Sequence, residues 1–337
     1  MTRREALEAV TRSLGSRAVA DVSLAPLCTY RVGGPAAVFV EAGSLADLEA
    51  ITTALGVVGG IAEDEVPTLV VGKGSNLLVA DAGFDGVVVH LGDAFTGLDI
   101  VRDTGLVRLG ASTLLPVAAR RTAAESLAGF EWAVGVPGSV GGAVRMNAGG
   151  HGSDMAATLR RAEVYDLRAG GPTTWSRPDL ELGYRCSAIG PSHVVLMAEL
   201  GLDEGDRSAS EDEIVDIVRW RRANQPGGQN AGSVFTNPPG DSAGRLIDAA
   251  GLKGFRIGTA EVSTKHANFV QADPDGSADD VYALIAAVRA RVEETFGIRL
   301  HCENLLVGFD DGTDASPSVS RPSAERGAGG GSVEGTP

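Results

Sequence analysis

The first third of the chain alternates short apolar runs with a segment of helical periodicity. Apolar runs with the length and β-branched content of strands are found at residues 36–41, 67–71 and 86–91. The segment at 44–55 lies between the first two runs and repeats its large apolar residues at helical spacing. It begins with Ser44 and Asp47, which are spaced as a capping box. This order predicts a β-α-β unit.

A second block of mixed elements starts near residue 107. A strand is expected at 107–112, and the amphipathic pattern at 113–127 predicts a helix. Two further apolar runs, at 161–167 and 193–200, predict strands that close the block near residue 202.

A third block follows the polar, acidic stretch at 203–213, which is poor in large apolar residues and is a candidate boundary. Helices are predicted at 213–225, 241–251 and 277–297. For the second helix we expect Asp241 as the N-cap and Gly251 as the stop. For the third we expect a capping box made by Ser277 and Asp280.

The last apolar segment, at 298–309, predicts a closing strand. The residues after it, 310–337, carry almost nothing to bury and predict a disordered tail. We therefore expect a polar lead-in at 1–19, three blocks that mix helices and strands, and this tail.

The composition is that of an ordinary globular protein, and it indicates in which cellular compartment the protein is found. Of the 337 residues, 43% are hydrophobic, and no run approaches the roughly 18–20 consecutive apolar residues that a membrane span needs. The start of the chain lacks the apolar core of a signal peptide. Three widely separated cysteines, Cys28, Cys186 and Cys302, argue against a disulfide framework or a zinc site. We therefore expect reduced thiols in the cytoplasm.

The net charge of the chain limits the classes of molecule that it is expected to bind. A net charge of −15 makes nucleic acids and anionic membranes poor partners. Residues 219–270, however, hold seven basic and three acidic side chains, an excess of four positive charges (7 − 3). This excess indicates an anionic small molecule, although a mixed solvated surface would have the same composition. We expect small-molecule partners. Separately from the charge, we expect the chain to be a monomer.

Two glycine-rich turns interrupt the apolar segments of the first two blocks. One is VGKGSNLLV at 71–79, and the other is VGVPGSVGGAVRMNAGG at 134–150, where six of 17 residues are glycine. Neither contains the G-x-G-x-x-G or G-x-x-x-x-G-K-[ST] pattern. Exposed backbone N–H groups in such turns can cradle a diphosphate, although each segment alone is also compatible with a plain tight turn.

Candidate reactive side chains lie later in the chain. Ser233, in NAGSVFTNP, lies outside any G-x-S-x-G elbow, so a serine hydrolase gains little support and a polar turn is an alternative. Glu303 lies in an apolar segment, where a carboxylate is costly unless it is paired or functional. Arg185, in LGYRCS, could be its partner, an anion ligand or half of a surface ion pair. The five histidines are scattered, and His266 has no partner at i+4, so no metal site is expected.

Several of these motifs occur together and in order. They are TYRVGGPA, VGKGSNLLV, GVPGSVGGAVRMNAG, LGYRCS, NAGSVFTNP, AGRLIDAAGLKGFRIGTAEVSTKHANF and CENLLVGF. Over residues 20–309 the chain resembles the UDP-N-acetylenolpyruvoylglucosamine reductase family, within the vanillyl-alcohol-oxidase-like (PCMH-type) FAD superfamily. The resemblance implies a two-part FAD-binding region at 20–92 and 93–202 and a smaller α+β substrate-binding domain at 203–309.

The resemblance also implies an activity. The family reduces UDP-N-acetylglucosamine enolpyruvate to UDP-N-acetylmuramate in bacterial cell-wall precursor synthesis. NADPH is the hydride donor, and FAD is the cofactor, expected here to be bound non-covalently. The implied catalytic positions are Ser233, as the proton donor, and Arg185 and Glu303, which act on the substrate carboxylate.

Binding positions carry over by motif in the same way. The implied FAD-binding residues are Arg31, Gly33, Gly72, Lys73, Gly74, Ser75, Asn76, Leu77, Gly135, Pro137, Gly138, Ser139, Gly141, Gly142 and Asn147. The implied substrate-binding residues are Asn237, Lys265 and His266. Only 48 positions (233 − 185) separate the catalytic arginine from the serine, which is similar to the shorter subtype that lacks a tyrosine-bearing substrate loop. Cys302 stands where the family often has proline.

Two other functions stay open from the sequence. A sugar-alcohol oxidase of the same flavin superfamily would share both turns, but many such oxidases tether flavin through His or Cys, and neither turn contains one. A non-catalytic UDP-sugar-binding protein is the other, and it would have no need of the three catalytic side chains.

Overall fold

The computed structural model describes residues 1–58 and 66–309, and the tail predicted at 310–337 lies outside this range. The first unit is a four-stranded sheet with the order β1-β2-β5-β3. Its strands are β1 (Ala18–Ser23), β2 (Pro35–Ala42), β3 (Thr68–Val71) and β5 (Phe84–Leu91). Both β2 and β3 run parallel to β5, which confirms the predicted β-α-β unit.

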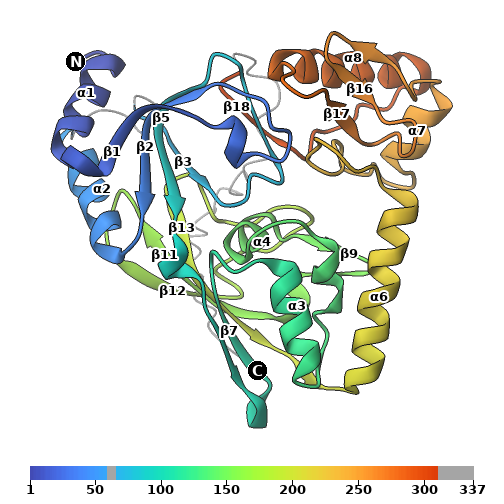
Figure 1. Cartoon of the computed structure of the whole chain (residues 1–337), viewed down its shortest axis with the longest axis horizontal. Coiled ribbons are helices and arrows are strands. Elements are labelled where there is room, and N and C mark those ends of the chain that lie inside the picture. The colour runs from blue at the N-terminus through green and yellow to red at the C-terminus, as the bar shows by residue number, and fades with distance from the viewer. Residues whose placement is uncertain (59–65, 310–337) are drawn as a thin grey trace, which may run out of the picture.

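Two helices, α1 (Arg3–Leu14) and α2 (Leu45–Val57), pack beside this sheet at one end of the molecule (Figure 1). Helix α1 falls within the predicted lead-in. Its buried apolar side chains share one core with those of α2 and the sheet, so the lead-in packs as part of the first unit.

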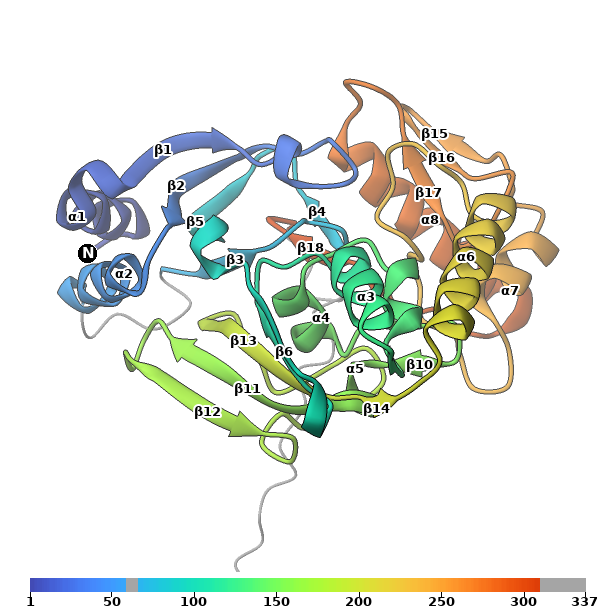
Figure 2. The same ribbon diagram turned by 60° about the horizontal axis from the view of Figure 1, so that its bottom comes forward.

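The second unit is built on a five-stranded antiparallel sheet with the order β12-β11-β13-β7-β6 (Figure 2). Its strands are β6 (Leu98–Val101), β7 (Leu106–Gly110), β11 (Leu159–Asp166), β12 (Pro172–Ser176) and β13 (His193–Gly201). Helices α3 (Leu115–Ala124) and α4 (Val140–Met146) pack with the sheet around one core. Shorter elements complete the unit: β8 (Leu127–Ala128), β9 (Gly149–Gly150), β10 (Ser153–Asp154), α5 (Met155–Thr158) and β14 (Asp203–Glu204). The strands and the helix predicted for this block are confirmed.

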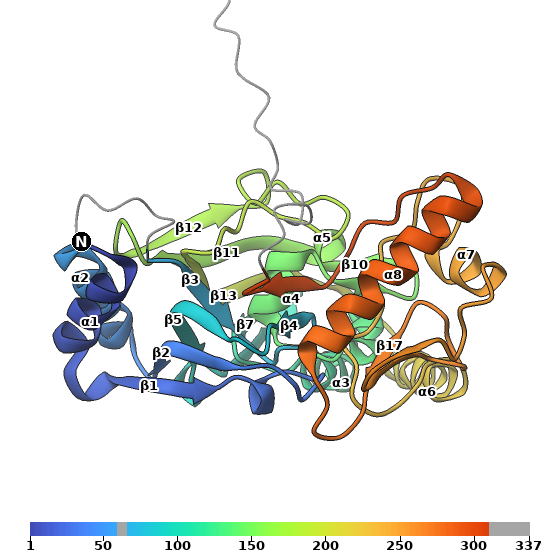
Figure 3. The ribbon, with the colours of Figure 1, turned by 90° about the horizontal axis from the view of Figure 1, so that it is seen from above.

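The third unit lies at the end of the molecule opposite α1 and α2 (Figure 3). Its elements are α6 (Arg207–Asn224), α7 (Ala243–Ala249), β15 (Arg256–Ile257), β16 (Ala260–Val262), β17 (Val270–Ala272) and α8 (Ala278–Phe296). Helix α6 begins inside the stretch predicted as a polar boundary, because Asp206 caps it by accepting from Ala209 N at 2.8 Å. Ile214 and Ile217 of this helix pack into the core of the second unit.

The end of the described chain returns to the first unit. Strand β18 (Leu305–Val307) pairs in parallel with β4 (Leu77–Val79) (Figure 2). The predicted closing strand at 298–309 is therefore shorter than expected, and a single bridge between Phe235 and Cys302 holds the residues before it. This return brings Glu303 beside the first glycine-rich turn.

The predicted capping boxes are only partly correct. Ser277 caps α8 as expected, since its hydroxyl accepts from Asp280 N at 3.1 Å. The Asp280 carboxylate binds Thr259 instead of closing the box. The box predicted for α2 is wrong, because Ser44 donates its hydroxyl to Asp47 at 2.8 Å and caps no backbone N–H.

The cap predicted for α7 is displaced by one residue. Ser242 is the N-cap and accepts from Arg245 N at 3.3 Å, whereas the Asp241 carboxylate pairs with the Arg245 guanidinium. Gly251, with a φ of 72°, follows the last turn of α7 and ends the helix as predicted.

Asp81 joins the first unit to the third. Its carboxylate accepts hydrogen bonds from the backbone N–H groups of Ala278 (2.9 Å) and Asp279 (3.2 Å) and from the Ser277 hydroxyl (2.5 Å). The two N–H groups belong to the first turn of α8, where no carbonyl of the helix can reach them. A carboxylate there also meets the positive end of the helix dipole.

We expect Asp81→Ala to lower the free energy of unfolding by about 1–2 kcal/mol, because it strands these donors at the start of α8. Scanning calorimetry should show a lower Tm. Asp99→Ala, at an exposed carboxylate on β6, is the matched control, with an expected change under about 0.5 kcal/mol. Equal shifts for the two variants would show that Asp81 does not clamp α8.

Candidate active site

The two glycine-rich turns lie against each other. The first joins β3 to β4, and the second leads from a short 3-10 helix (Glu131–Gly135) into α4. A Cβ atom added at Gly72 would lie 2.5 Å from Ser139 Oγ, and one at Gly138 would lie 3.1 Å from Ser75 Oγ. A side chain at either glycine would crowd the serine hydroxyl of the other turn, and glycine lets the two turns approach this closely.

A cleft opens along the two turns. Its open volume is about 1220 Å³, and a second hollow of about 800 Å³ continues from it. Gly72, Lys73, Ser139 and Arg145 border both hollows. Because these residues border both hollows, the two hollows form one continuous cleft.

The cleft wall carries unused hydrogen-bond donors. Within residues 1–58 and 66–309, no acceptor is found for the backbone N–H groups of Lys73, Gly74, Ser75, Gly138 and Ser139. Backbone N–H groups left without a partner in glycine-rich turns suit a diphosphate. The two turns thus fit the diphosphate of the FAD that the sequence motifs imply.

Most of the predicted FAD-binding residues border this cleft. The larger hollow is lined by Gly72, Lys73, Gly74, Ser75, Asn76, Leu77, Gly135, Pro137, Gly138, Ser139 and Gly142, and the smaller one by Gly141. Arg31 and Gly33 border neither hollow. Arg31 is exposed, with its guanidinium on Pro26 O at 2.7 Å, and Gly33 packs so closely that a Cβ would meet Val79 O at 2.6 Å.

Asn147 also lies off the cleft. It is buried, and its side-chain nitrogen donates to Gly183 O at 2.8 Å and to Asp154 at 3.2 Å. Its side-chain oxygen accepts from Ala156 N at 2.9 Å. With these hydrogen bonds made, the side chain holds the loop around Gly183 rather than facing a ligand.

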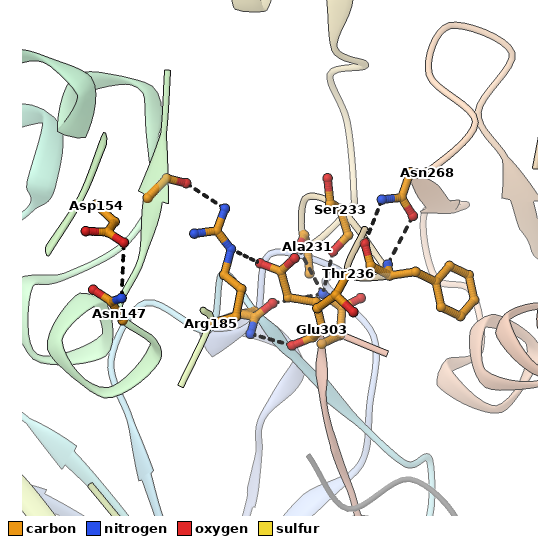
Figure 4. A network of polar contacts seen from close by, with 12 residues as sticks. Asn147, Asp154, Arg185, Ala231, Ser233, Thr236, Asn268 and Glu303 are labelled. Carbon is orange, nitrogen blue, oxygen red and sulfur yellow. Dashed lines mark hydrogen bonds and ion pairs between the residues drawn. The ribbon is translucent and has the colours of Figure 1, made fainter. Parts of the chain in front are cut away.

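Arg185, Ser233 and Glu303 all line the cleft, although they lie far apart in the sequence. Figure 4 shows Arg185 and Glu303 pointing toward one another, with Arg185 Nε 2.8 Å from Glu303 Oε1. Ser233 and Glu303 come from paired extended segments, in which Glu303 N donates to Val234 O at 2.7 Å. The structure therefore brings the three predicted catalytic residues to one place.

Arg185 is held at the tip of a tight turn. Gly183 and Cys186 pair on either side of it, and its φ of 59° lies in the left-handed region that few non-glycine residues adopt. Its Nη2 donates to Gly149 O at 2.8 Å. Its Nε lies 2.8 Å from Glu303 Oε1, and the two side chains form an ion pair. Such backbone strain is typical of functional positions.

The Arg185–Glu303 pair is poorly solvated, with the two side chains 22% and 17% exposed. Burial raises the pKa of the Glu303 carboxyl above its ordinary value, and the charge of Arg185 opposes this rise. A second anion bound beside Glu303 would raise its pKa further. The carboxyl group could then keep a proton and donate it in a hydrogen bond to that anion.

Two arginines of the cleft are absent from the predicted binding residues, although Arg221 belongs to the basic segment at 219–270. Arg145 of α4 and Arg221 of α6 line it, and burial lowers the pKa of both guanidinium groups. In the described chain neither has a carboxylate partner, and Arg221 Nε donates to Gln225 Oε1 at 2.7 Å. Unpaired cations in a cleft favour an anionic ligand. In the sequence both are ordinary helix arginines, and only their burial distinguishes them.

The predicted substrate-binding residues belong to the third unit but do not border either hollow. Asn237 is exposed, and its side-chain oxygen accepts from Ala243 N at 3.1 Å. Lys265 Nζ donates to Arg222 O at 2.5 Å, near the end of α6. His266 packs edge-on against Phe269, with ring centroids 4.8 Å apart, and Phe269 lines the cleft. Burial lowers the pKa of His266.

Cys302 lies in a segment that is hydrogen-bonded on both sides of it. The hydrogen bonds on either side of it are Thr236 N to His301 O (2.9 Å) and Glu303 N to Val234 O (2.7 Å). The N–H group of Cys302 itself has no acceptor in the described residues, so a proline here would lose no hydrogen bond. Burial raises the pKa of the Cys302 thiol to about 12, so the thiol is not a thiolate at neutral pH.

Comparisons with known proteins agree with this geometry. Residues 36–174 match the family model "FAD binding domain", and residues 224–307 match "UDP-N-acetylenolpyruvoylglucosamine reductase, C-terminal domain". The UDP-N-acetylenolpyruvoylglucosamine reductase of Heliobacterium modesticaldum is 40% identical over 321 residues, which cover 94% of this chain and 99% of that protein. The chain belongs to the UDP-N-acetylenolpyruvoylglucosamine reductase family.

Further UDP-N-acetylenolpyruvoylglucosamine reductases show the same relationship. The reductase of Rubrobacter xylanophilus is 39% identical over 290 residues, covering 86% of this chain and 94% of that protein. The crystal structure of the reductase (MurB) from Thermus caldophilus superposes with a TM-score of 0.73 at 35% identity. The match covers 86% of this chain and 99% of that one.

Membership of the reductase family confirms the predicted α+β fold class, with an FAD-binding region and a C-terminal substrate domain, and it confirms FAD as the cofactor. Neither the sugar-alcohol oxidase nor the non-catalytic binding protein is supported. Ser233 and Glu303 lie within the matched C-terminal region, whereas Arg185 lies between the two matched regions. In the described chain, no helix is long and apolar enough to cross a bilayer, and no cluster of His, Cys, Asp and Glu could hold a metal.

Proposed function

We propose that the chain catalyses the NADPH-dependent reduction of UDP-N-acetylglucosamine enolpyruvate to UDP-N-acetylmuramate, a step of peptidoglycan precursor synthesis. Family membership supports the reaction. The observation that supports these particular residues is the convergence of Ser233, Arg185 and Glu303 on the cleft walled by the glycine-rich turns. When bound, FAD supplies the redox chemistry by carrying a hydride from NADPH to the methylene carbon of the enolpyruvyl group.

Ser233 is the proton donor. Its hydroxyl makes no hydrogen bond to another described residue, so the O–H group is free to turn toward a ligand. The hydroxyl delivers its proton to the carbon that bears the substrate carboxylate, where negative charge develops. A serine is a weak acid, and it is effective here because the reacting carbon is held in contact with it.

Arg185 and Glu303 bind the substrate carboxylate. The guanidinium is a preorganised cation at the place where negative charge develops, which is usually a large catalytic contribution. Glu303 binds the carboxylate in its protonated form, because two bare anions in contact would repel each other. The raised pKa of Glu303 favours this form.

The remaining cleft residues bind the cofactor and the substrate. The unpartnered N–H groups of the two turns would hold the FAD diphosphate, and Arg145 adds a cation where the two hollows meet. Arg221 and Gln225, on the side of the third unit, contact the anionic part of the substrate, with Asn237, Lys265 and His266 farther out. The protein acts as a monomer on small molecules in the cytoplasm, where its three free cysteines stay reduced.

The activity is tested by following NADPH consumption with UDP-N-acetylglucosamine enolpyruvate and by identifying the product by mass spectrometry. We expect consumption that depends on this substrate and a product that carries two additional hydrogens. UDP-N-acetylglucosamine, which lacks the enolpyruvyl group, is the control and should give no turnover. Hydrogen peroxide formation with a sugar alcohol would instead favour an oxidase.

A further inference from the structure

Asn304, the residue next to Glu303, is 1% exposed and joins three distant parts of the chain. Its side-chain nitrogen donates to Asn76 Oδ1 at 2.9 Å and to Ala231 O at 3.1 Å, with Ser233 O at 3.4 Å sharing a hydrogen. Its side-chain oxygen accepts from the buried Tyr30 hydroxyl at 3.4 Å. Figure 4 shows Ala231 and Ser233, on one side of this network, close to Glu303.

Asn76, in the first glycine-rich turn, completes the connection. Its side-chain nitrogen donates to Glu303 O at 2.9 Å, and its backbone oxygen accepts from Leu305 N at 2.8 Å. The Asn76 side chain thus binds the residue on the N-terminal side of Asn304, and the Asn76 main chain binds the residue on its C-terminal side. A turn that walls the cleft is thereby fixed to the segment that carries Glu303.

Asn304 therefore contacts both sides of the catalytic corner. Ser233 and Ala231 come from the third unit, Asn76 from the first, and Glu303 from the returning chain between them. Asn304 is absent from the cleft lining and reaches the site only through backbone and amide groups. A displacement of about 1 Å in a reacting group can cost on the order of 100-fold in rate.

We propose that Asn304 is a positioning residue that sets Ser233 and Glu303 relative to the glycine-rich wall of the cofactor cleft. This role rests on the reductase function proposed above. It requires the amide nitrogen specifically, because all three of the groups that face it are oxygens. Aspartate has nearly the same shape but would place an acceptor against these acceptors, which is costly in a buried site.

The test compares the two half-reactions of holoenzyme variants by anaerobic stopped-flow absorbance. We expect Asn304→Asp and Asn304→Ala to slow oxidation of the reduced flavin by UDP-N-acetylglucosamine enolpyruvate by roughly 10- to 100-fold. Reduction of the flavin by NADPH should change less than about threefold, because it does not use Ser233 or Glu303. Asn304→Ser, which keeps one donor, should be faster in the oxidative half-reaction than Asn304→Ala.

Asp81→Ala is the matched control, because it removes another contact between the first and third units without touching Ser233 or Glu303. It should leave both half-reactions unchanged. The proposal is overturned if the reduced flavin of Asn304→Asp is oxidised at the wild-type rate, or if both half-reactions of this variant slow equally. It is also overturned if Asp81→Ala shows the same kinetic defect. Should the aspartate variant fail to hold FAD, the alanine and serine variants decide. If the wild-type flavin is not oxidised by this substrate, the reductase function itself fails.

Discussion

Ser233→Ala will slow oxidation of the reduced flavin by UDP-N-acetylglucosamine enolpyruvate by about 10²–10⁴-fold, the range that a positioned general acid contributes. Alanine removes the hydroxyl proton and changes little else, since the Ser233 side chain makes no hydrogen bond within the described chain. The carbon that gains negative charge would then have to take its proton from water. Reduction of the flavin by NADPH needs no such proton and should keep its rate.

Stopped-flow absorbance of the flavin separates the two steps in a single preparation. Ser208→Ala makes the same chemical change on the exposed face of α6 and should leave both half-reactions unaltered. Equal loss in both half-reactions of Ser233→Ala would mean that the residue supports cofactor binding or folding and does not deliver the proton.

Arg185→Leu is the second variant with a large expected effect. It removes the cation that faces the substrate carboxylate, so the oxidative half-reaction should slow by about 10²–10³-fold. It also removes the charge that opposes the rise in the pKa of Glu303. The pKa of Glu303 should therefore rise further, and the carboxyl should stay protonated to a higher pH than in the wild-type protein.

The rise in the pKa of Glu303 can be measured directly. Infrared difference spectra recorded at a series of pH values follow the band of the protonated carboxyl group. In Arg185→Leu the band of Glu303 should disappear at a higher pH than in the wild-type protein. Glu303→Gln, which lacks the carboxyl group, identifies the band. Arg177→Leu, at an exposed arginine earlier in the same unit, is the control for losing a positive charge. If the Glu303 band of Arg185→Leu titrates at the same pH as in the wild-type protein, the two groups are not electrostatically coupled.

Much of the fold follows from the sequence where periodicity is long or strands are strongly apolar. Helix α8 was readable because its stripe of buried residues repeats over its whole length, and the β-α-β unit because its strands are almost wholly apolar. The start of α6 was missed because residues 207–213 are polar on nearly every face, and only the Asp206 cap starts the helix there. The Ser44 box failed because Asp47 is engaged by Arg17 and Gly43.

Some features of the site could likewise be predicted from the sequence, and others could not. The glycine content of the two turns indicated a close backbone approach, and the structure gives the cause, since each turn packs on the other. The roles of Ser233, Arg185 and Glu303 came from motif resemblance, because no local pattern reports that residues so far apart converge. The sequence marked Arg221 only as one of seven basic residues at 219–270, and it gave no signal for Arg145 or Asn304. The burial of these three side chains depends on segments from separate units.

The central claim is that this chain passes electrons from NADPH to UDP-N-acetylglucosamine enolpyruvate, and one anaerobic experiment tests it most directly. The purified holoenzyme is reduced with one equivalent of NADPH, the substrate is added, and the flavin absorbance is followed. We predict rapid return of the oxidised flavin spectrum together with formation of UDP-N-acetylmuramate, and no return with UDP-N-acetylglucosamine. Flavin that stays reduced in the presence of the enolpyruvyl substrate would contradict the account.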